Sequence, residues 1–315
     1  MNAKLKSFLL DKTAATDVRE KETIQTLWSG YGSIRRIVLE GSELPSVIVK
    51  HIQLQKKGNH PRGWNSDLGH QRKLRSYQVE VQWYQHYNAR CKARIPKCYG
   101  VMEEDNEVWI LLEDLDAAGF FIRKQRLDWT GVSNCLQWLA QFHACFLHQR
   151  PVGLWEMGTY WHLDTRPQEL EELSDLNLKN AATRIDQKLN DCNYKTLVHG
   201  DAKLANFCFS TTSEVAGVDF QYVGGGCGMK DVAYFVGSCL DEEQSEVLEA
   251  KILDTYFSYL KDQLNHEGEK VEDEWRPLYV VAWADFHRFL KGWSPGHWKL
   301  NSYSERITQN VIKNL

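Results

Sequence analysis

The feature that most constrains the fold is a short apolar run followed at once by a spaced set of polar residues. Leu197-Val198 leads into Asp201, with Lys203 two residues later and Asn206 five residues later. A second β-type run, Val215–Val218, ends in Asp219. Phosphoryl transfer from ATP needs such groups: a carboxylate that orients the attacking hydroxyl, ligands for Mg²⁺, and cations near the developing charge.

The spacing of these residues predicts a role for each. We expect Asp201 to accept the proton of an acceptor hydroxyl and Lys203 to reach the γ-phosphate of ATP. Asn206 and Asp219 are the expected ligands of Mg²⁺. A turn rich in Asp and Asn caps with solvated charges would explain either element alone. Both elements, in this order and at this separation, favour catalysis.

These motifs also carry a resemblance to known proteins. The run His199–Asn206 resembles the H-G-D-x-x-x-x-N catalytic loop of the aminoglycoside phosphotransferase and choline kinase superfamily. Asp219-Phe220-Gln221 is similar to the metal-binding D-F-G of protein kinases, with Gln in the last place. With Lys230–Phe235 and Leu139–Ala144, it makes the chain most similar to the ecdysteroid-kinase-like group. The resemblance implies an α+β, two-lobed protein-kinase-like fold.

The distribution of β-type and helical patterns agrees with two lobes. We expect residues 1–112 to form an N-terminal ATP-binding lobe, 113–117 the hinge, and 118–315 a C-terminal helical lobe for catalysis and substrate binding. The patterns predict strands at 24–28, 34–40, 46–52, 98–103, 108–113, 196–198 and 215–220, the first three as an antiparallel meander. They predict helices at 76–88, 136–146, 246–264 and 279–290.

Lys50 and Glu80 are the expected clamp for the nucleotide. Period-two alternation puts Lys50 on the same strand face as Ile48 and Ile52, where an unpaired lysine is costly. Glu80 lies on an aromatic stripe of the predicted helix and is the partner we expect. In kinases such a pair positions the α- and β-phosphates. Two unrelated surface charges are the alternative.

Two further segments are expected to contact ATP. The turn Ser29-Gly30-Tyr31-Gly32-Ser33 falls where a kinase has its phosphate-covering loop, so Gly30, Gly32 and Ser33 are candidate phosphate-binding residues. An ordinary hairpin turn is the alternative. We expect the adenine at the hinge backbone of Glu113 and Leu115.

The segment after Asp219 bears on the substrate class. Only eleven residues separate Asp219 from Asp231, and they include the run Gly224-Gly225-Gly226-Cys227-Gly228. A protein kinase has a long activation segment there, so this spacing disfavours protein substrates. By resemblance, Asp231 would support the catalytic loop through backbone hydrogen bonds instead of contacting ATP. A helix N-cap is the other interpretation of Asp231.

A basic stretch and a set of tryptophans have less specific interpretations. Residues 53–75 are interpreted as a solvated insertion, with a flap that attracts anions as the alternative. Tryptophans in the C-terminal half favour an acceptor that is flat and apolar or carries a quaternary ammonium group, although some of them must belong to the core. These two sets are Lys56, Lys57, Arg62, Arg72, Lys73 and Arg75, and Trp155, Trp161, Trp275, Trp283, Trp293 and Trp298.

Composition excludes several classes of protein. A formal net charge of −4 argues against nucleic acid as the main partner. Eight scattered cysteines without a C-x-x-C pair predict reduced thiols and neither a zinc site nor a disulfide framework. The apolar run Phe8-Leu9-Leu10 is too short for a signal peptide, and no run is long enough to span a membrane. We therefore expect a cytoplasmic protein with no membrane partner.

The sequence as a whole predicts an ATP- and Mg²⁺-dependent phosphotransferase that acts on a hydroxyl of a small molecule. A catalytically silent nucleotide-binding scaffold of the same fold is one alternative, and it would be marked by loss of the base or of a metal ligand. A protein kinase is the other alternative.

Overall fold

The small lobe is built on a five-stranded antiparallel sheet with the order β1-β2-β3-β5-β4. The structure, a computed structural model, describes residues 1–27, 30–54 and 67–315. The predicted meander is correct for the first three strands, but β5 pairs with β3 and leaves β4 at the edge. The strands are β1 Asp17–Thr26, β2 Gly32–Glu40, β3 Ser46–Gln53, β4 Cys98–Glu104 and β5 Glu107–Glu113.

The first strand differs from the prediction. β1 begins at Asp17 instead of residue 24, and Trp28, which the prediction included, lies outside the described residues. Nine of its ten residues are exposed, because β1 is an edge strand and its sequence is dominated by charged and polar side chains. Such a strand has no apolar alternation, and this is why its first half was not predicted.

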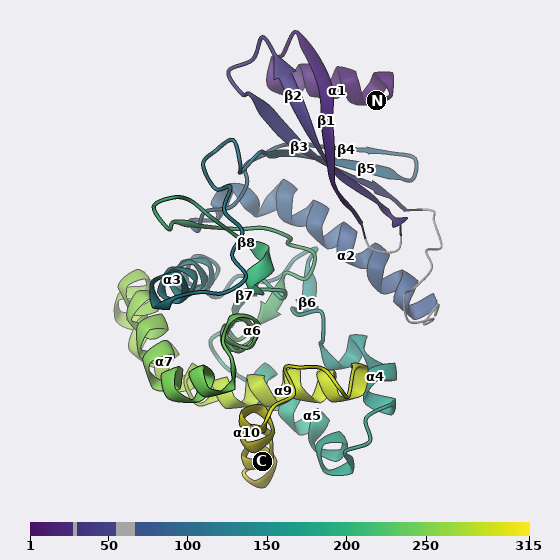
Figure 1. Ribbon diagram of the computed structural model, residues 1–315. Coiled ribbons are helices and arrows are strands. Elements are labelled where there is room, and N and C mark those ends of the chain that lie inside the picture. The colour runs from purple at the N-terminus through teal and green to yellow at the C-terminus, as the bar shows by residue number, and fades with distance from the viewer. Residues whose placement is uncertain (28–29, 55–66) are drawn as a thin grey trace.

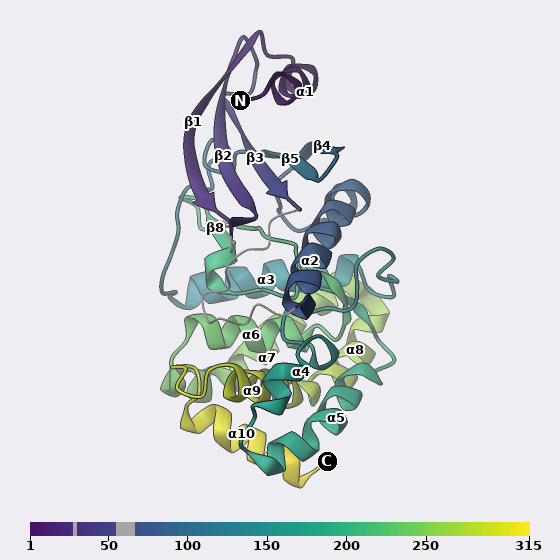
Figure 2. The ribbon, with the colours of Figure 1, turned by 90° about the vertical axis from the view of Figure 1, so that its right-hand side faces the viewer.

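Each face of the sheet is covered by one helix (Figures 1 and 2). Helix α1, Ala3–Thr13, begins at an Asn2 cap that accepts a hydrogen bond from Leu5 N–H. Its buried Leu5 and Leu9 join the cluster of outward-facing strand residues that includes Val49. The sequence patterns did not predict this helix.

Helix α2, Asp67–His86, crosses from the sheet to the large lobe and starts nine residues earlier than predicted. Arg72, Lys73 and Arg75 therefore lie on a helix and contact the other lobe, so the solvated-insertion interpretation is wrong for them. Lys56, Lys57 and Arg62 of the same stretch lie outside the described residues.

The large lobe is mainly helical, and in its described residues the helices surround two small sheets, one of three strands and one of two. Strand β10 lies between β6 and β7, and β8 pairs with β9. Its helices are α3 Trp129–Cys145, α4 Pro167–Glu171, α5 Leu176–Asn190, α6 Met229–Cys239, α7 Glu242–Leu264, α8 Gly268–Trp275, α9 Leu278–Trp293 and α10 Ser302–Lys313. Its strands are β6 Trp155–Met157, β7 Thr196–Val198, β8 Phe207–Phe209, β9 Val215–Gly217 and β10 Gly224–Gly226.

The lobes meet across a continuous apolar core. Trp83 of α2 stacks on Phe220, with ring centroids 4.6 Å apart, and packs against Phe142 of α3. This packing fixes α2 against the segments that carry Asp201 and Asp219. The N-terminus lies at the sheet and the C-terminus at the opposite end of the large lobe (Figure 2).

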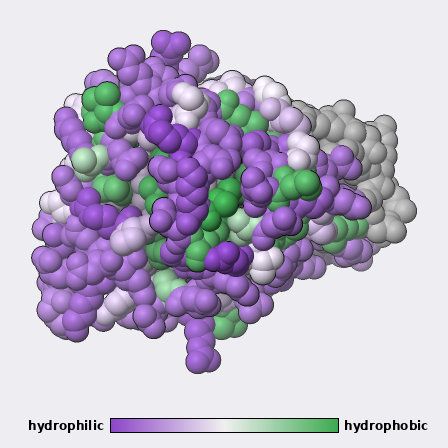
Figure 3. All heavy atoms as spheres, turned by 90° about the horizontal axis from the view of Figure 1, so that it is seen from below, coloured by the Kyte–Doolittle hydropathy of each residue, from purple (hydrophilic) through white to green (hydrophobic). Residues whose placement is uncertain are grey.

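The surface at the large-lobe end is mostly hydrophilic, with hydrophobic residues in separate groups (Figure 3). Among the helices that the structure describes, none combines the length and the apolar character needed to cross a bilayer.

Candidate active site

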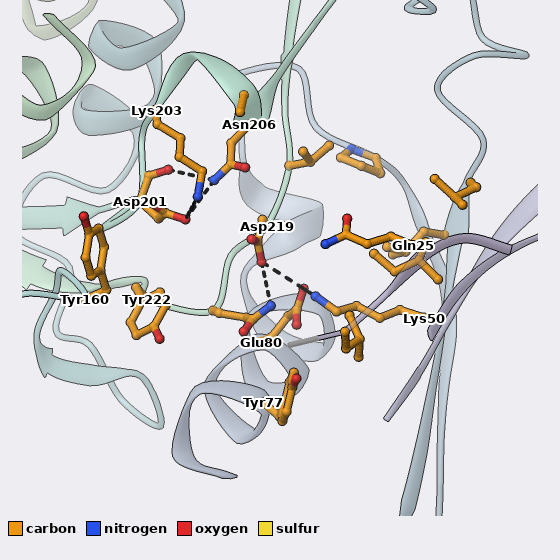
Figure 4. A pocket seen from close by; sticks show the side chains of 18 of the residues that line it. Gln25, Lys50, Tyr77, Glu80, Tyr160, Asp201, Lys203, Asn206, Asp219 and Tyr222 are labelled. Carbon is orange, nitrogen blue, oxygen red and sulfur yellow. Dashed lines mark hydrogen bonds and ion pairs between the residues drawn. The ribbon is translucent and has the colours of Figure 1, made fainter. Parts of the chain in front are cut away.

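A cavity of about 940 Å³ lies between the lobes, and residues of both lobes line it. Lys50 of β3 and Glu80 of α2 lie on one side, and Asp201 and Asn206 lie on the other (Figure 4). Asp219 lies between these two groups. The volume is at the upper end of the range for small-molecule sites, which suits two ligands side by side.

The expected contact between Lys50 and Glu80 is confirmed. Lys50 Nζ donates to Glu80 Oε1 at 2.7 Å, and both side chains are buried. Lys50 Nζ also lies 3.6 Å from Asp219 Oδ1. Burial would lower the pKa of Lys50, but the two carboxylates raise it above its ordinary value, so the ammonium group stays charged.

Asp201 is held by three side chains. Its Oδ1 accepts a hydrogen bond from Tyr234 Oη at 3.0 Å. Its Oδ2 accepts from Lys203 Nζ and from Asn206 Nδ2, both at 3.0 Å. Burial raises the pKa of Asp201 while Lys203 opposes that rise. The carboxylate is therefore fixed in orientation and more basic than an ordinary aspartate.

Asn206 and Asp219 leave oxygens available for a metal. The amide of Asn206 turns its nitrogen toward Asp201 and its oxygen away from it (Figure 4). No described residue donates a hydrogen bond to Asn206 Oδ1 or Asp219 Oδ2. The described residues contain no group of three or more His, Cys, Asp or Glu side chains that could hold a metal alone. One carboxylate and one amide fit Mg²⁺, which fills its other positions with water and phosphate oxygens.

Asp219 is kept ionised by surrounding lysines. Burial opposes its ionisation, but Lys50, Lys203 and Lys73 outweigh burial and hold its pKa below the ordinary value. Its backbone has φ of 72°, a conformation that a residue other than glycine rarely adopts. Asp219 also lines the cavity, and backbone conformations of this kind cluster at functional sites.

The loop that carries Asp201 is anchored by Asp231 of α6. Asp231 Oδ2 accepts a hydrogen bond from His199 N–H at 2.5 Å, and Oδ1 accepts from Gly200 N–H at 2.9 Å. His143 of α3 lies 3.1 Å from the same carboxylate. The predicted support of the loop through its backbone is thus confirmed. Asp231 lies in the first turn of α6 and is not its N-cap, which is Gly228.

Gly200 can only be glycine in this loop. Its φ is 77°, and a Cβ atom there would lie 2.1 Å from the carbonyl oxygen of Tyr222. The close approach of these two backbones places Asp201 next to the segment that follows Asp219.

Comparison with known families identifies the chain. The ecdysteroid kinase-like family profile matches residues 70–150 and 156–269, which together make up more than half of the sequence. The chain belongs to this family. The match covers both the catalytic-loop motif and Asp219.

Solved structures show the same fold. One is a protein from Ralstonia eutropha JMP134 that is described as an aminoglycoside phosphotransferase. It matches with a TM-score of 0.56 and 12% identity, over 98% of this chain and 94% of that one. A macrolide 2′-phosphotransferase from Brachybacterium faecium matches with a TM-score of 0.51 and 12% identity, over 98% and 97% of the two chains. At this identity the likeness shows the fold alone. No curated protein matches the sequence significantly.

In this ecdysteroid kinase-like protein, the glutamine after Asp219-Phe220 links the two lobes. Gln221 Nε2 donates to Asp219 Oδ1 at 2.7 Å, and Gln221 Oε1 accepts from Lys73 Nζ of α2 at 3.0 Å. Apart from the departure from D-F-G, no local pattern predicts this role. Gln221 thereby fixes the position of Asp219, the proposed metal ligand, relative to α2.

We expect Gln221→Ala to raise the Mg²⁺ concentration needed for half-maximal activity by about 10–100-fold, because outer partners of metal ligands commonly have effects of that size. Mg²⁺ titrations of the initial transfer rate measure this change. Gln85→Ala is the matched control, since Gln85 also lies on α2 but its side-chain amide donates to Glu103, which is exposed and does not line the cavity. An unchanged Mg²⁺ requirement in Gln221→Ala would show that Gln221 does not position Asp219.

The segment predicted as the hinge places a backbone donor at the cavity. Leu115 lines the cavity, and its carbonyl oxygen accepts a hydrogen bond from Phe120 N–H. Within the described part of the chain, no group accepts a hydrogen bond from Leu115 N–H. Glu113 also lines the cavity, with its carboxylate bound by Arg94 and its backbone N–H donating to Lys97 O.

The residues predicted to bind phosphate in the glycine turn are not among those that line the cavity in the described part of the chain. Gly30 lies between β1 and β2, and Gly32 and Ser33 are the first residues of β2. The described cavity wall here is formed instead by Leu27, Tyr31 and Ile34. Gly32 has a structural reason to be glycine, since a Cβ would lie 2.0 Å from His51 O. Ser29 lies outside the described residues.

Tyrosines, more than tryptophans, form the wall next to Asp201. Of the six tryptophans predicted as pocket or core, only Trp293 is among the described residues that line the cavity. Trp161, Trp275 and Trp283 are buried in the core, and Trp298 is exposed. Four aromatic residues of this wall come from separate segments and were therefore not predicted: Tyr160, Tyr222, Tyr234 and Phe289.

Proposed function

We propose that this protein transfers the γ-phosphate of Mg·ATP to a hydroxyl group of a small molecule. The observation that carries the proposal is the convergence of Asp201, Asn206 and Asp219 with the Lys50–Glu80 pair on one cavity between the lobes. Kinases need this combination of a base, metal ligands and a phosphate clamp. The phosphotransferase names of the two solved structures support the same reaction class.

Each residue has a task that its contacts support. Asp201 accepts the proton of the acceptor hydroxyl as the oxygen attacks phosphorus, and Tyr234 and Asn206 hold its carboxylate in place. Lys203, bound to Asp201 Oδ2, is within reach of the transferred phosphoryl group. Mg²⁺ held by Asn206 and Asp219 would neutralise charge on the phosphate oxygens. Adenine accepts a hydrogen bond from Leu115 N–H, for which the described residues provide no acceptor.

The alternatives are less well supported. A silent scaffold would be expected to lack the base or a metal ligand, yet all of these groups are present and line the cavity. A protein kinase needs an activation segment that holds a peptide. Here the corresponding residues form β10, which is enclosed between β6 and β7 and buried. Gly224 shows how tight this packing is, since a Cβ there would lie 2.4 Å from Trp155 O.

The test is transfer of radioactive γ-phosphate from Mg·ATP by the purified protein to a metabolite extract, with casein as a protein substrate. We expect a labelled small molecule, no labelling after chelation of Mg²⁺, and no labelling by the Asp219→Asn variant. Labelled casein without a labelled small molecule would favour the protein kinase. Mg·ATP binding without any transfer would favour the scaffold.

A double-mutant cycle tests the clamp. We expect Lys50→Met and Glu80→Gln each to weaken productive ATP binding, and the double variant to be no worse than the poorer single variant, because the two side chains act as a pair. Initial rates over a range of ATP concentrations measure kcat/KM for each variant. The pair Lys261 and Glu272, 2.8 Å apart at the surface of the large lobe, provides control variants. Simple additivity would show that Lys50 and Glu80 act independently.

A further inference from the structure

Two arginines from different lobes line the same cavity as Asp201. Arg72 lies on α2, and Arg166 lies just before α4. Arg72 Nη1 donates to Thr165 O at 2.6 Å, so its guanidinium group lies next to the residue that precedes Arg166. The two arginines are therefore neighbours in space although 93 residues separate Arg72 from Thr165 in sequence.

The charges at this place do not balance. Arg166 donates to Glu169 Oε1 at 3.1 Å, and Glu169 is buried. Within the described residues, Arg72 forms no ion pair. Burial and the positive charge of Arg166 lower the pKa of Arg72 to about 10, so the arginine remains charged at neutral pH. Half-buried Arg72 and buried Arg166 thus share one carboxylate, and charges removed from water are normally compensated by a partner.

The arginines lie on the acceptor side of the cavity. The Arg166 guanidinium carbon is 5.9 Å from the centroid of the Tyr160 ring and 5.4 Å from that of Phe289. Tyr160 packs against Tyr234, which donates to Asp201. Figure 4 shows Tyr160 near Asp201, whereas Lys50 lies across the cavity. An acceptor whose hydroxyl meets Asp201 would lie along this wall, toward Arg166.

We propose that the acceptor combines an apolar ring body with an anionic group, and that Arg72 and Arg166 bind the anion. This inference deepens the proposed function and rests on it. A guanidinium group offers planar paired donors that match a carboxylate, sulfate or phosphate. Tyr160, Tyr222 and Phe289 provide the apolar surface for the ring. A quaternary ammonium acceptor, which the tryptophan content favoured, would meet like charge at this position.

Arg75 provides a control that distinguishes anion binding by Arg72 from a purely structural contact between the lobes. Arg75 lies one turn after Arg72 on α2 and also reaches the large lobe, where it donates to Leu154 O at 2.8 Å. It is not among the described residues that line the cavity. If both arginines only tie α2 to the large lobe, their replacement should have the same consequences. If Arg72 binds an anion, only its replacement should affect charge recognition.

The experiment uses three probes that share a hydroxymethyl naphthalene body and differ in charge: 6-(hydroxymethyl)-2-naphthoate, its neutral carboxamide, and the corresponding trimethylammonium compound. Calorimetric titration of the full-length protein without nucleotide measures their affinities. We expect the naphthoate to bind about tenfold or more tightly than the carboxamide, as charge-assisted hydrogen bonds imply, and the cation to bind most weakly. Arg72→Met should abolish the preference, and Arg75→Met should preserve it.

Arg72→Lys keeps the positive charge but loses the planar paired donors of the guanidinium group, so we expect an intermediate preference for naphthoate over carboxamide. This variant replaces Arg72→Met in the test if Arg72→Met does not fold. Equal affinity for the three probes in the unmodified protein would overturn the proposal. So would an equal loss of naphthoate binding in Arg72→Met and Arg75→Met. A loss of Mg·ATP affinity in Arg72→Met as large as that for naphthoate would assign the arginines to the nucleotide phosphates and likewise reject it.

Failure of this inference can be told apart from failure of the proposed function. Probe binding is measured without nucleotide and does not depend on transfer. Retained charge preference without phosphate transfer to any probe or metabolite would support the anion site and count against the kinase. Transfer to neutral and anionic acceptors with equal kcat/KM would support the kinase and overturn the anion site.

Discussion

The Asp201→Ala variant is expected to lose about 10²–10⁴-fold in kcat, the usual range for removal of a general base. Asp201 lines the cavity, and its carboxylate is oriented by Tyr234 and Asn206. The proposed nucleotide contacts come mainly from Lys50 and Asp219, so the affinity for Mg·ATP should change little. Initial rates with a labelled acceptor and calorimetric titration of Mg·ATP measure the two quantities.

The pH dependence provides a second readout of the same residue. Asp201 must be ionised to accept a proton, and burial raises its pKa above the ordinary 3.8. The kcat/KM of the unmodified protein should therefore fall on acidification at a pH above 3.8, and this acid limb should disappear in Asp201→Ala. Asp164→Asn, at a side chain that is 85% exposed, is the control. Near-full transfer by Asp201→Ala would contradict the assignment of the base.

Asp231→Ala is expected to lower both stability and activity, with the largest effect on stability of the proposed variants. The substitution leaves His199 N–H and Gly200 N–H without their acceptor in a fully buried position. Each orphaned donor costs about 1–3 kcal/mol, a large share of the roughly 5–15 kcal/mol that stabilises a typical domain. A displaced loop would also move Asp201, and an error of about 1 Å can lower the rate about 10²-fold.

Urea denaturation measures the loss of stability, and transfer rates well below the unfolding transition measure the loss of activity. Asp128→Ala is the comparison, because Asp128 also accepts a backbone hydrogen bond, from Gly131 N–H at the start of α3, but does not line the cavity. Loss of such a cap costs about 1 kcal/mol. If the two variants unfold at the same urea concentration, Asp231 does not anchor the catalytic loop.

Local sequence patterns were informative where a residue type was unusual for its setting. Lys50 between two isoleucines on one strand face predicted a buried ion pair, and the structure contains it. The strand Thr196–Val198 before Asp201 was predicted with its observed bounds. The fold class followed from the motif spacing through its resemblance to a known superfamily. Such signals lie within a few residues of one another, so a single sequence is enough to read them.

Contacts between distant segments could not be predicted in the same way. Helix α1 covers a sheet face that exists only after the strands have paired, and β1 is too polar to show alternation. The role of Gln221 depends on the approach of Lys73, which lies 148 residues earlier in the chain.

The sequence by itself determined the two-lobed fold class and the residues that make up the candidate catalytic loop, because spacing along one strand or loop fixes which side chains lie together. Only the tertiary structure decided which walls surround that loop. It placed Tyr160, Tyr234 and Phe289 next to Asp201, and it brought Arg72 of one lobe beside Arg166 of the other. The physical reason is that a cavity wall is assembled by packing of separate elements, and no local pattern records that packing.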